Sequence, residues 1–452
     1  MKKLTIIIKS LKALTVIAAL AFATPGTAQV KKGFSLRYQS SINGDVIVVG
    51  NNTISRTATG NYNGEDGNHD FSNNVYVDID NDNSTFNSSS ANISNPYPND
   101  ACLTIDKVLL YWAAADKGVE NNGYEYDNQP NWHYNKVKLM LPGQTNYTTV
   151  SADEVIFRGR DENPHFINDA YICVKDITSS VLNNNNSFGK YQVANVEGRE
   201  GYLYSHDGNN TGTSGGWQIV LVYKTDQLTR KNISLFDGYA NVTSSNNNFN
   251  IDFNGFQTVP NGPVNSDLII GALEGDRDLS GDRLQMLNSS NNFVDLDAPL
   301  RPSDNFFNSR ITNGNSNFVD RNPSSLNTLG FDSAVFSLNN TGNTLLHNNQ
   351  TSTTLRLTSN QEAYGLYLLG LAVEVYEPKL DPIFYTATPN NITPNGGPQT
   401  VTYTASTTNS GNDDAANISF TTTVPMGSEL VEPIAGLPSG VTYSYNNSTR
   451  QL

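Results

Sequence analysis

Short apolar runs rich in β-branched and aromatic residues recur along this chain of 452 residues, and almost none of them has helical spacing. The run 217–223 is nearly continuous in Trp, Ile, Val, Leu and Tyr, which is typical of a strand inside a sheet. Similar runs lie at 107–112, 268–273 and 367–376, and 74–79 alternates apolar with polar residues. Because Asn- and Gly-rich turns separate these runs, we predict an all-β fold of antiparallel sheets packed as sandwiches. A single short helix is predicted at 177–182, with Asp176 as its cap.

A cluster of prolines divides the chain into a large and a small region. Five prolines fall within 378–398, which we interpret as a stiff linker that includes the first strand of the next module. The preceding residues, 29–377, are predicted to form a large β-sandwich region. This length is compatible with either one elaborated sandwich or two lobes, and the Asn-rich stretch 246–254 is the candidate seam between lobes.

The segment 385–452 has the pattern of an immunoglobulin-like β-sandwich module. An alternating strand at 401–407 precedes turn residues at 409–412, a second strand at 416–420 and a Val-Pro step at 424–425. A complete sandwich needs roughly 100 residues, so the module is incomplete within this sequence. We therefore expect the native polypeptide to continue beyond Leu452.

The first 28 residues are predicted to be a secretory signal peptide. Basic residues precede an apolar core at 13–23, and the small residues of 24–28 provide a cleavage site after Ala28. An uncleaved anchor is the alternative, although the apolar core is short for a membrane span. We expect an exported chain at the cell surface, on the exterior of the outer membrane, with no transmembrane span after signal removal.

The chain is acidic, with a net charge of −15 at pH 7, and removal of the signal peptide with its four lysines brings this to about −19. A field of this sign repels phosphate backbones, which argues against nucleic acid as a partner. The same carboxylates offer oxygen ligands to hard cations such as calcium.

The sequence contains two cysteines, Cys102 and Cys173. In an exported chain such a pair predicts one disulfide, which would contribute about 4 kcal/mol in the chain-entropy model. The alternative is two free, buried thiols.

Two acidic loops are candidate calcium sites. In the first loop the candidate ligands are Asp276, Asp278, Ser280 and Asp282. Their spacing, with Gly281 for a sharp turn, matches the opening of an EF-hand loop, but the closing acid is replaced by Leu287. In the second loop the candidate ligands are Asp78, Asp80 and Asp82. The alternatives are a solvated acidic turn for the first loop and a capped strand end for the second.

We predict that the chain is not an enzyme. The five histidines are scattered without the spacing of a metal site or a catalytic triad, and no His-Glu-x-x-His motif occurs. The alternative is glycoside hydrolysis by a pair of carboxylates. Candidates for that pair are Glu154, Glu162, Glu197 and Glu200.

Aromatic residues in one polar, loop-like segment are a candidate glycan-contact patch. They are Tyr124, Tyr126, Trp132 and Tyr134. Exposed aromatic faces stack on the C–H surfaces of sugar rings. The alternative is that these side chains fold over the end of a sheet and are buried.

A series of short motifs follows in order through the large region. They lie at 43–52, 78–82, 110–112, 176–178, 191–196, 215–217, 236–238, 274–276 and 281–284. On these motifs the region resembles the N-terminal part of the SprB-type motility adhesins of gliding Bacteroidetes, and 385–452 resembles a DUF11-type repeat. The resemblance implies long repeat arrays, export by the type IX secretion system, and secretion and gliding machinery as partners. The sorting domain that such cargo carries at its C-terminus is not found in these residues. The triplet 332–334 is similar to the O-glycosylation acceptor pattern of this phylum, which makes Ser333 a candidate attachment point.

The sequence thus predicts an exported cell-surface adhesin or surface-structural protein, the N-terminal part of a large repeat protein. It would bind surface glycans or another extracellular ligand, and the resemblance implies a role in gliding motility. The alternatives are a secreted carbohydrate-binding or polysaccharide-processing exoprotein, and a structural spacer without a ligand.

Overall fold

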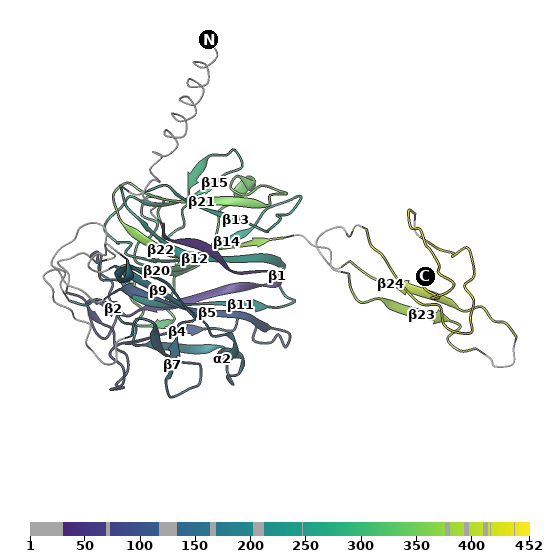
Figure 1. The fold of residues 1–452 in the computed structure, drawn as a ribbon, viewed down its shortest axis with the longest axis horizontal. Coiled ribbons are helices and arrows are strands. Elements are labelled where there is room, and N and C mark those ends of the chain that lie inside the picture. Colours follow the sequence, from purple (N-terminus) through teal and green to yellow (C-terminus); the bar gives the residue numbers. More distant parts are fainter. Residues whose placement is uncertain are drawn as a thin grey trace, which may run out of the picture. The chain divides into compact units, whose positions relative to one another are not determined.

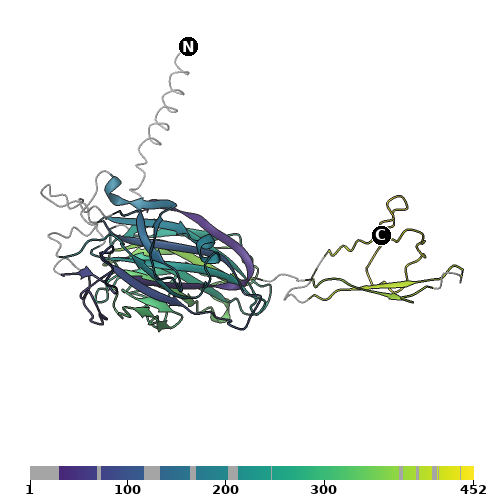
Figure 2. The same ribbon diagram turned by 90° about the horizontal axis from the view of Figure 1, so that it is seen from below.

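The computed structural model divides into two compact units. It describes residues 30–68, 73–116, 133–162, 169–201, 212–245, 247–375, 380–392, 397–409, 415, 417–437 and 439–452. Unit 1 ends at Val375, and unit 2 covers 376–452. Figures 1 and 2 show unit 1 as a stack of β-sheets. The predicted all-β sandwich class is therefore confirmed.

The largest sheet has eleven strands, and its described pairings are antiparallel except for β17 with β20. In spatial order the strands are β18 (Ser316–Asn317), β17 (Ile311–Asn313), β20 (Phe331–Ser337), β14 (Ser266–Leu273), β22 (Tyr364–Glu374), β12 (Arg230–Val242), β1 (Val30–Asn52), β11 (Gly215–Lys224), β5 (Thr104–Ala115), β9 (Ala170–Asp176) and β8 (Glu154–Arg158).

Four smaller sheets complete the described structure. The five-stranded sheet contains β19 (Arg321–Asn322), β4 (Ser88–Ile93), β10 (Gly189–Ala194), β6 (Lys136–Met140) and β7 (Thr148–Ser151). The four-stranded sheet contains β13 (Phe249–Asn254), β21 (Ser352–Ser359), β15 (Asp282–Leu287) and β16 (Phe293–Asp295). Two-stranded sheets join β2 (Ile54–Ser55) to β3 (Val75–Tyr76) and β23 (Phe384–Thr388) to β24 (Thr402–Ser406). The helical elements are α2 (Thr178–Leu182) and the 3₁₀ turns η1 (Gly159–Asp161) and η2 (Thr341–Asn343).

The eleven-stranded sheet folds back on itself at β1. The first part of this strand pairs with β12 up to Asn43, and the second part pairs with β11 from Gly44 onward. In a flat sheet, β22 and β5 would lie roughly 19 Å apart at about 4.8 Å per strand. The rings of Tyr367 in β22 and Tyr111 in β5 are instead 6.2 Å apart. The strands from β18 to the first part of β1 (the β22 half) therefore face those from the second part of β1 to β8 (the β5 half) across a shared core.

Each half is covered on its outer face by a smaller sheet. A second apolar cluster joins Trp112 and Trp217 of the β5 half to Val193 of the five-stranded sheet. On the other side, Phe236 of the β22 half packs edge to face on Phe253 of β13, with centroids 4.7 Å apart. Unit 1 thus has four layers, and Figure 1 shows the four-stranded sheet (β13, β15, β21) and the five-stranded sheet (β4, β7) on opposite sides of the stack.

The strongest sequence patterns agree with the observed elements. The runs 107–112, 217–223 and 268–273 lie in β5, β11 and β14, whereas 74–79 contributes only the two residues of β3. The predicted helix is α2, but its N-cap residue is Ile177 and not the predicted Asp176. The Asp176 carboxylate, one residue earlier, accepts a hydrogen bond of 2.9 Å from the backbone N–H of Thr178. Residues 249–254, within the candidate seam, form β13, which pairs with β21 about 100 residues later in unit 1.

Unit 2 has little regular structure in its described residues. β24 covers most of the predicted strand 401–407, but its partner is the preceding segment β23, and residues 417–420 of the second predicted strand are not in a strand. Several large apolar side chains are exposed, including Phe384 at 74 % and Met426 at 93 %.

The predicted disulfide is not formed, and both thiols are free. Cys173 lies opposite Trp112 in the β9–β5 pair, whereas Cys102 precedes the start of β5 by two residues. Ten residues of mostly extended chain separate Cys102 from Trp112, a distance on the order of 30 Å, and a disulfide requires Cα atoms within about 7 Å. Cys102 is exposed, while Cys173 is buried, and burial raises the pKa of its thiol.

Candidate functional site

The four-stranded sheet has one apolar face and one polar face. Side chains such as Ile251, Leu355 and Leu284 alternate with polar residues along their strands and are buried against the β22 half. Because successive side chains point to opposite sides of a strand, the residues between them stand on the outer face of unit 1.

A row of four polar side chains crosses this outer face. The strand registers place Arg356 of β21 opposite both Asn250 of β13 and Gln285 of β15, and Gln285 opposite Asp295 of β16. Arg356 donates from Nε to the Asn250 side-chain oxygen at 2.9 Å, and Gln285 donates to Asp295 at 2.7 Å. The row is therefore held in place by its own hydrogen bonds.

Two arginines of the face have different charge environments. Arg283 forms an ion pair of 2.6 Å with Asp295, so its charge is compensated. The Arg356 guanidinium lies 3.4 Å from the centroid of the Phe293 ring. Within the described residues, no carboxylate lies within ion-pair distance of Arg356. This guanidinium therefore remains a source of positive charge on the outer face.

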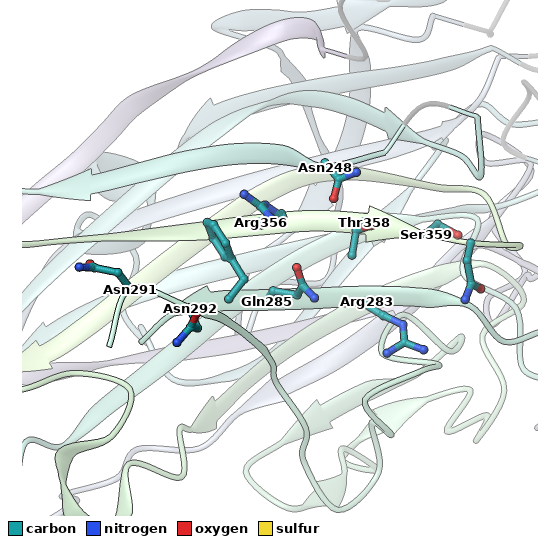
Figure 3. Close-up of a pocket in the computed structure, with 10 residues that line it drawn as sticks. Asn248, Arg283, Gln285, Asn291, Asn292, Arg356, Thr358 and Ser359 are labelled. Atoms are coloured by element: carbon teal, nitrogen blue, oxygen red, sulfur yellow. The ribbon is translucent and has the colours of Figure 1, made fainter. Parts of the chain in front are cut away.

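A groove of about 610 Å³ opens on this face. The lining residues are Asn248, Arg283, Gln285, Asn291, Asn292, Phe293, Arg356, Thr358, Ser359 and Asn360. Figure 3 shows Arg283 and Gln285 on one strand, Arg356 and Thr358 on its neighbour, and Asn291 and Asn292 at one end. The lining thus combines amides, hydroxyls and guanidinium groups with one aromatic ring. Such groups donate and accept hydrogen bonds in directions that suit a ligand rich in hydroxyl groups.

The first predicted calcium loop is split between the interior and the surface. Asp276 and Asp282 are buried, whereas Asp278 and Ser280 are exposed. The Asp276 carboxylate accepts a hydrogen bond of 2.7 Å from the backbone N–H of Asn68, and the Asp282 carboxylate accepts one of 2.5 Å from Phe307. The four predicted ligands therefore do not surround a common centre by themselves.

A residue outside that loop joins its buried acids. Glu362, in the connection between β21 and β22, accepts a hydrogen bond from the backbone N–H of Asp276. Burial, followed by the nearby charges of Asp282, Glu274 and Asp276, raises the pKa of Glu362 well above its usual range. Burial also raises the pKa of the Asp282 carboxyl to about 7.

In the second predicted calcium loop, the carboxylates accept hydrogen bonds from other residues of the protein. Asp80 accepts hydrogen bonds from the Tyr147 hydroxyl at 2.5 Å and from Gln192 at 2.7 Å. Partial burial acts to raise the pKa of Asp80, but the hydrogen bonds from Tyr147 and its other neighbours hold it below the usual value. Asp82 accepts from the backbone of Ser84, and Asp78 accepts from the Ser88 hydroxyl. As the side chains of the described residues stand, no three acidic, histidine or cysteine groups are gathered so as to hold a metal ion.

The predicted glycan-contact aromatics are only partly described. Tyr124, Tyr126 and Trp132 lie outside the described residues. Tyr134 is half-buried, with its ring edge to face on Tyr171 at 5.9 Å and the Arg158 guanidinium 3.8 Å above its centroid. This environment agrees with the alternative in which the aromatic residue packs over the end of a sheet.

Ser333 does not fit the predicted role of a glycan attachment point. It lies in β20 between β14 and β17 and is fully buried. A glycan attached to this hydroxyl would have no room in the folded chain, because the interior is close-packed.

The groove residues were not singled out by sequence patterns. The strands 352–359 and 282–287 do alternate Leu or Met with polar residues, which predicts a half-buried sheet. That pattern does not reveal that Arg356, Gln285 and Asp295 become neighbours, because strand register alone brings them together.

Comparisons with known proteins place this chain in no family. No protein-family description and no curated protein matches it. Among solved structures, GK1651 from Geobacillus kaustophilus is 11 % identical with a TM-score of 0.16, over 76 % of this chain and 96 % of that one. PBCV-1 VP54, fitted into a reconstruction of the virophage Sputnik, is 9 % identical with a TM-score of 0.17, over 77 % of this chain and 96 % of that one. TM-scores this low carry no argument about fold or function. In the described part of the chain, no helix is long and apolar enough to cross a membrane.

Proposed function

We propose that this chain is an exported cell-surface adhesin that holds a glycan in the groove of the four-stranded sheet. The observation that carries the proposal is the polar row of Asn250, Arg356, Gln285 and Asp295, whose side chains are ordered by mutual contacts before any ligand binds. Preorganised polar groups lose less conformational entropy on binding, so a shallow groove of this kind supports useful affinity.

The composition of the groove favours binding over turnover. Its ten lining residues include no Asp, Glu, His or Cys, the side chains that usually act as general acid, general base or thiol nucleophile. The nearest acid in the row, Asp295, is engaged by Arg283 and Gln285. A polysaccharide-processing activity would need catalytic side chains that lie outside the groove.

Export and surface display remain proposals that rest on the sequence. The signal-like residues 1–28 lie outside the described part, and the resemblance to gliding adhesins is carried by short motifs. The chain divides into a unit with a groove and a second β-unit, which is the organisation expected of a binding unit on a stalk. Many copies of such a protein would bind a surface tightly even if each contact is weak, because multivalent binding raises the overall affinity. Transport by type IX secretion and movement along the cell follow only if that resemblance holds.

The test is a glycan array followed by titration of the best ligand. Arg356→Ala and Gln285→Ala should each weaken binding about tenfold or more, because each removes hydrogen bonds to the ligand, a charged one in the case of Arg356. Acidic polysaccharides should bind more tightly than neutral ones of the same size, since Arg356 has no carboxylate partner. Asp252→Ala is the matched control, because Asp252 is exposed on the same sheet but does not line the groove.

The outcomes separate the alternatives. Equal affinity of all three variants and the unaltered protein would place the glycan elsewhere and defeat the proposal. Release of reducing ends from any polysaccharide would indicate an enzyme. Binding to nothing on the array, with the fold intact, would favour a spacer.

A further inference from the structure

One lysine lies between two carboxylates at the rim of the shared core. Lys231 Nζ is 2.8 Å from Asp45 Oδ2 and 2.7 Å from Asp267 Oδ2. The side chains of these three residues (the Lys231 triad) are only 11 % to 26 % exposed. Among the described residues, no other Lys or Arg forms an ion pair with either carboxylate. Two acids thus share one cation at a position mostly removed from water.

Three strands that are distant in sequence bring the triad together. Lys231 is near the start of β12, and strand alternation places it on the same face as Ile233 of the shared core. Asp267 is near the start of β14 and shares a face with Ile269 of the same core. Asp45 follows the point at which β1 changes partner, so it belongs to the β5 half. The triad therefore spans the junction of the two halves.

Each carboxylate of the triad is held by a further donor. Asp45 Oδ1 accepts a hydrogen bond of 2.8 Å from the backbone N–H of Val46, and Asp267 Oδ1 accepts one of 2.6 Å from the Ser337 hydroxyl. In both cases the other carboxylate oxygen faces Lys231. The fold thus holds an amine and a carboxyl group in contact. Groups that are held and aligned in this way react as if at effective molarities of about 10⁵–10⁸ M.

The two acids of the triad differ in protonation. Burial raises the pKa of Asp45, although the charge of Lys231 acts against this, and a raised pKa favours the neutral carboxyl that an amine can attack. Burial acts to lower the pKa of Lys231, but the charges of Asp45 and Asp267 hold it above its usual value. The amine therefore has to lose a proton before it attacks, and Asp267 is the second carboxylate within reach of Nζ.

We propose that Lys231 and Asp45 become joined by an intramolecular amide bond, with Asp267 as the proton acceptor. Asp267 takes a proton from the Lys231 ammonium, and the neutral amine attacks Cγ of the protonated Asp45 carboxyl. The N–C bond forms while the C–Oδ2 bond breaks, and the hydroxyl leaves with a second amine proton as one water molecule. The third amine proton stays on the amide, Asp267 returns its proton to solvent, and nothing is oxidised or reduced.

The amide would tie β12 to the part of β1 that belongs to the β5 half, and the two joined residues are 186 positions apart in sequence. It would therefore hold the two halves of the large sheet together covalently at the point where the sheet folds back. The low exposure of the triad also protects the amide from hydrolysis, since water has little access to it. This proposal does not depend on glycan binding.

The test is the intact mass of the purified, folded protein, followed by peptide mapping. The mass should fall below the value calculated from the sequence by one water molecule, and tryptic cleavage after Lys231 should be lost. A branched peptide should join the segment that contains Asp45 to the segment that contains Lys231. Lys231→Arg keeps the positive charge between the two acids and should have its full calculated mass. Asp267→Asn should slow formation of the cross-link about a hundredfold or more after refolding, because the proton acceptor is gone.

The pair of Lys107 and Asp176 is an internal control in the same digest. These two groups are also 2.8 Å apart, but their side chains are 30 % and 41 % exposed, and no second carboxylate of the described residues pairs with Lys107. Their peptides should be unmodified. The full calculated mass of the unaltered protein, after prolonged incubation in the folded state, would overturn the proposal. A lost water that maps to other residues, or an unchanged rate of cross-linking in Asp267→Asn, would equally contradict it.

Discussion

Arg301 and Asp332 form an ion pair that is almost completely removed from water, with side chains 1 % and 0 % exposed and a separation of 2.7 Å. The guanidinium also donates to the carbonyl oxygens of Phe306 and Arg310, both at 2.9 Å. The carboxylate accepts from the backbone N–H of Ser309 at 3.0 Å. The pair therefore holds the loop 301–310 against β20, and its charges are balanced only while both partners are present.

Asp332→Asn should destabilise the protein by about 3–5 kcal/mol, because it leaves the Arg301 charge buried without a counter-charge. Chemical denaturation followed by the fluorescence of the buried tryptophans measures this loss. The control is Lys107→Met, which breaks a 2.8 Å pair with Asp176 whose side chains are 30 % and 41 % exposed. That change should cost less than about 1 kcal/mol. Equal losses in the two variants would contradict the role given to the buried pair.

At the scale of single elements, β1 is unusual because it pairs with a strand of each half of the large sheet. It spans 23 residues and passes from the β22 half to the β5 half, so it belongs to both sides of the shared core. The change of partner falls between Asn43 and Gly44. At that point a Cβ atom on Gly44 would lie 1.9 Å from the backbone oxygen of Tyr223. The close approach of β11 therefore requires a residue without a side chain.

Gly44→Ala should destabilise unit 1 by about 2–3 kcal/mol, because the added methyl group meets backbone, which cannot rotate away. The control lies in the same strand: nothing is within 4 Å of a Cβ placed on Gly33. Gly33→Ala should be neutral or slightly stabilising, since alanine restricts the unfolded chain. Thermal or chemical unfolding of both variants checks this. A Gly44→Ala variant as stable as Gly33→Ala would show that β1 and β11 are not held so closely.

How far the sequence predicts this molecule depends on the distance over which residues interact. Continuous apolar runs such as 217–223 identify buried strands, because burial on both faces leaves a local pattern. Strand pairing is not local, since β13 pairs with β21 about 100 residues later and β17 pairs in parallel with β20. The groove and the contact of Glu362 with Asp276 depend on such pairings. Asp276 and Asp282 could be predicted as candidate ligands from their loop, whereas Glu362 could not, because its approach depends on the fold.

For the whole molecule, the division at Val375 predicts that unit 1 folds without unit 2. Both apolar clusters of the described structure lie entirely before that residue, and Val375 itself still donates its N–H to Arg230. A chain that ends after Val375 should therefore keep its main thermal midpoint within about 2 °C of the full chain. Unit 2 should contribute a separate, weak transition, because a two-stranded sheet is marginally stable alone.

Differential scanning calorimetry of the two chains measures these transitions, and a third chain provides the control. Ending the polypeptide at residue 363 removes β22, which lies between β14 and β12 in the β22 half. Loss of this strand, which is buried except at Glu374, exposes both neighbouring edges and opens the shared core, so cooperative unfolding should disappear. A clear fall in the midpoint of the chain ending at Val375 would show that the second unit supports the first. The apolar clusters of unit 1 would then not be sufficient for its stability.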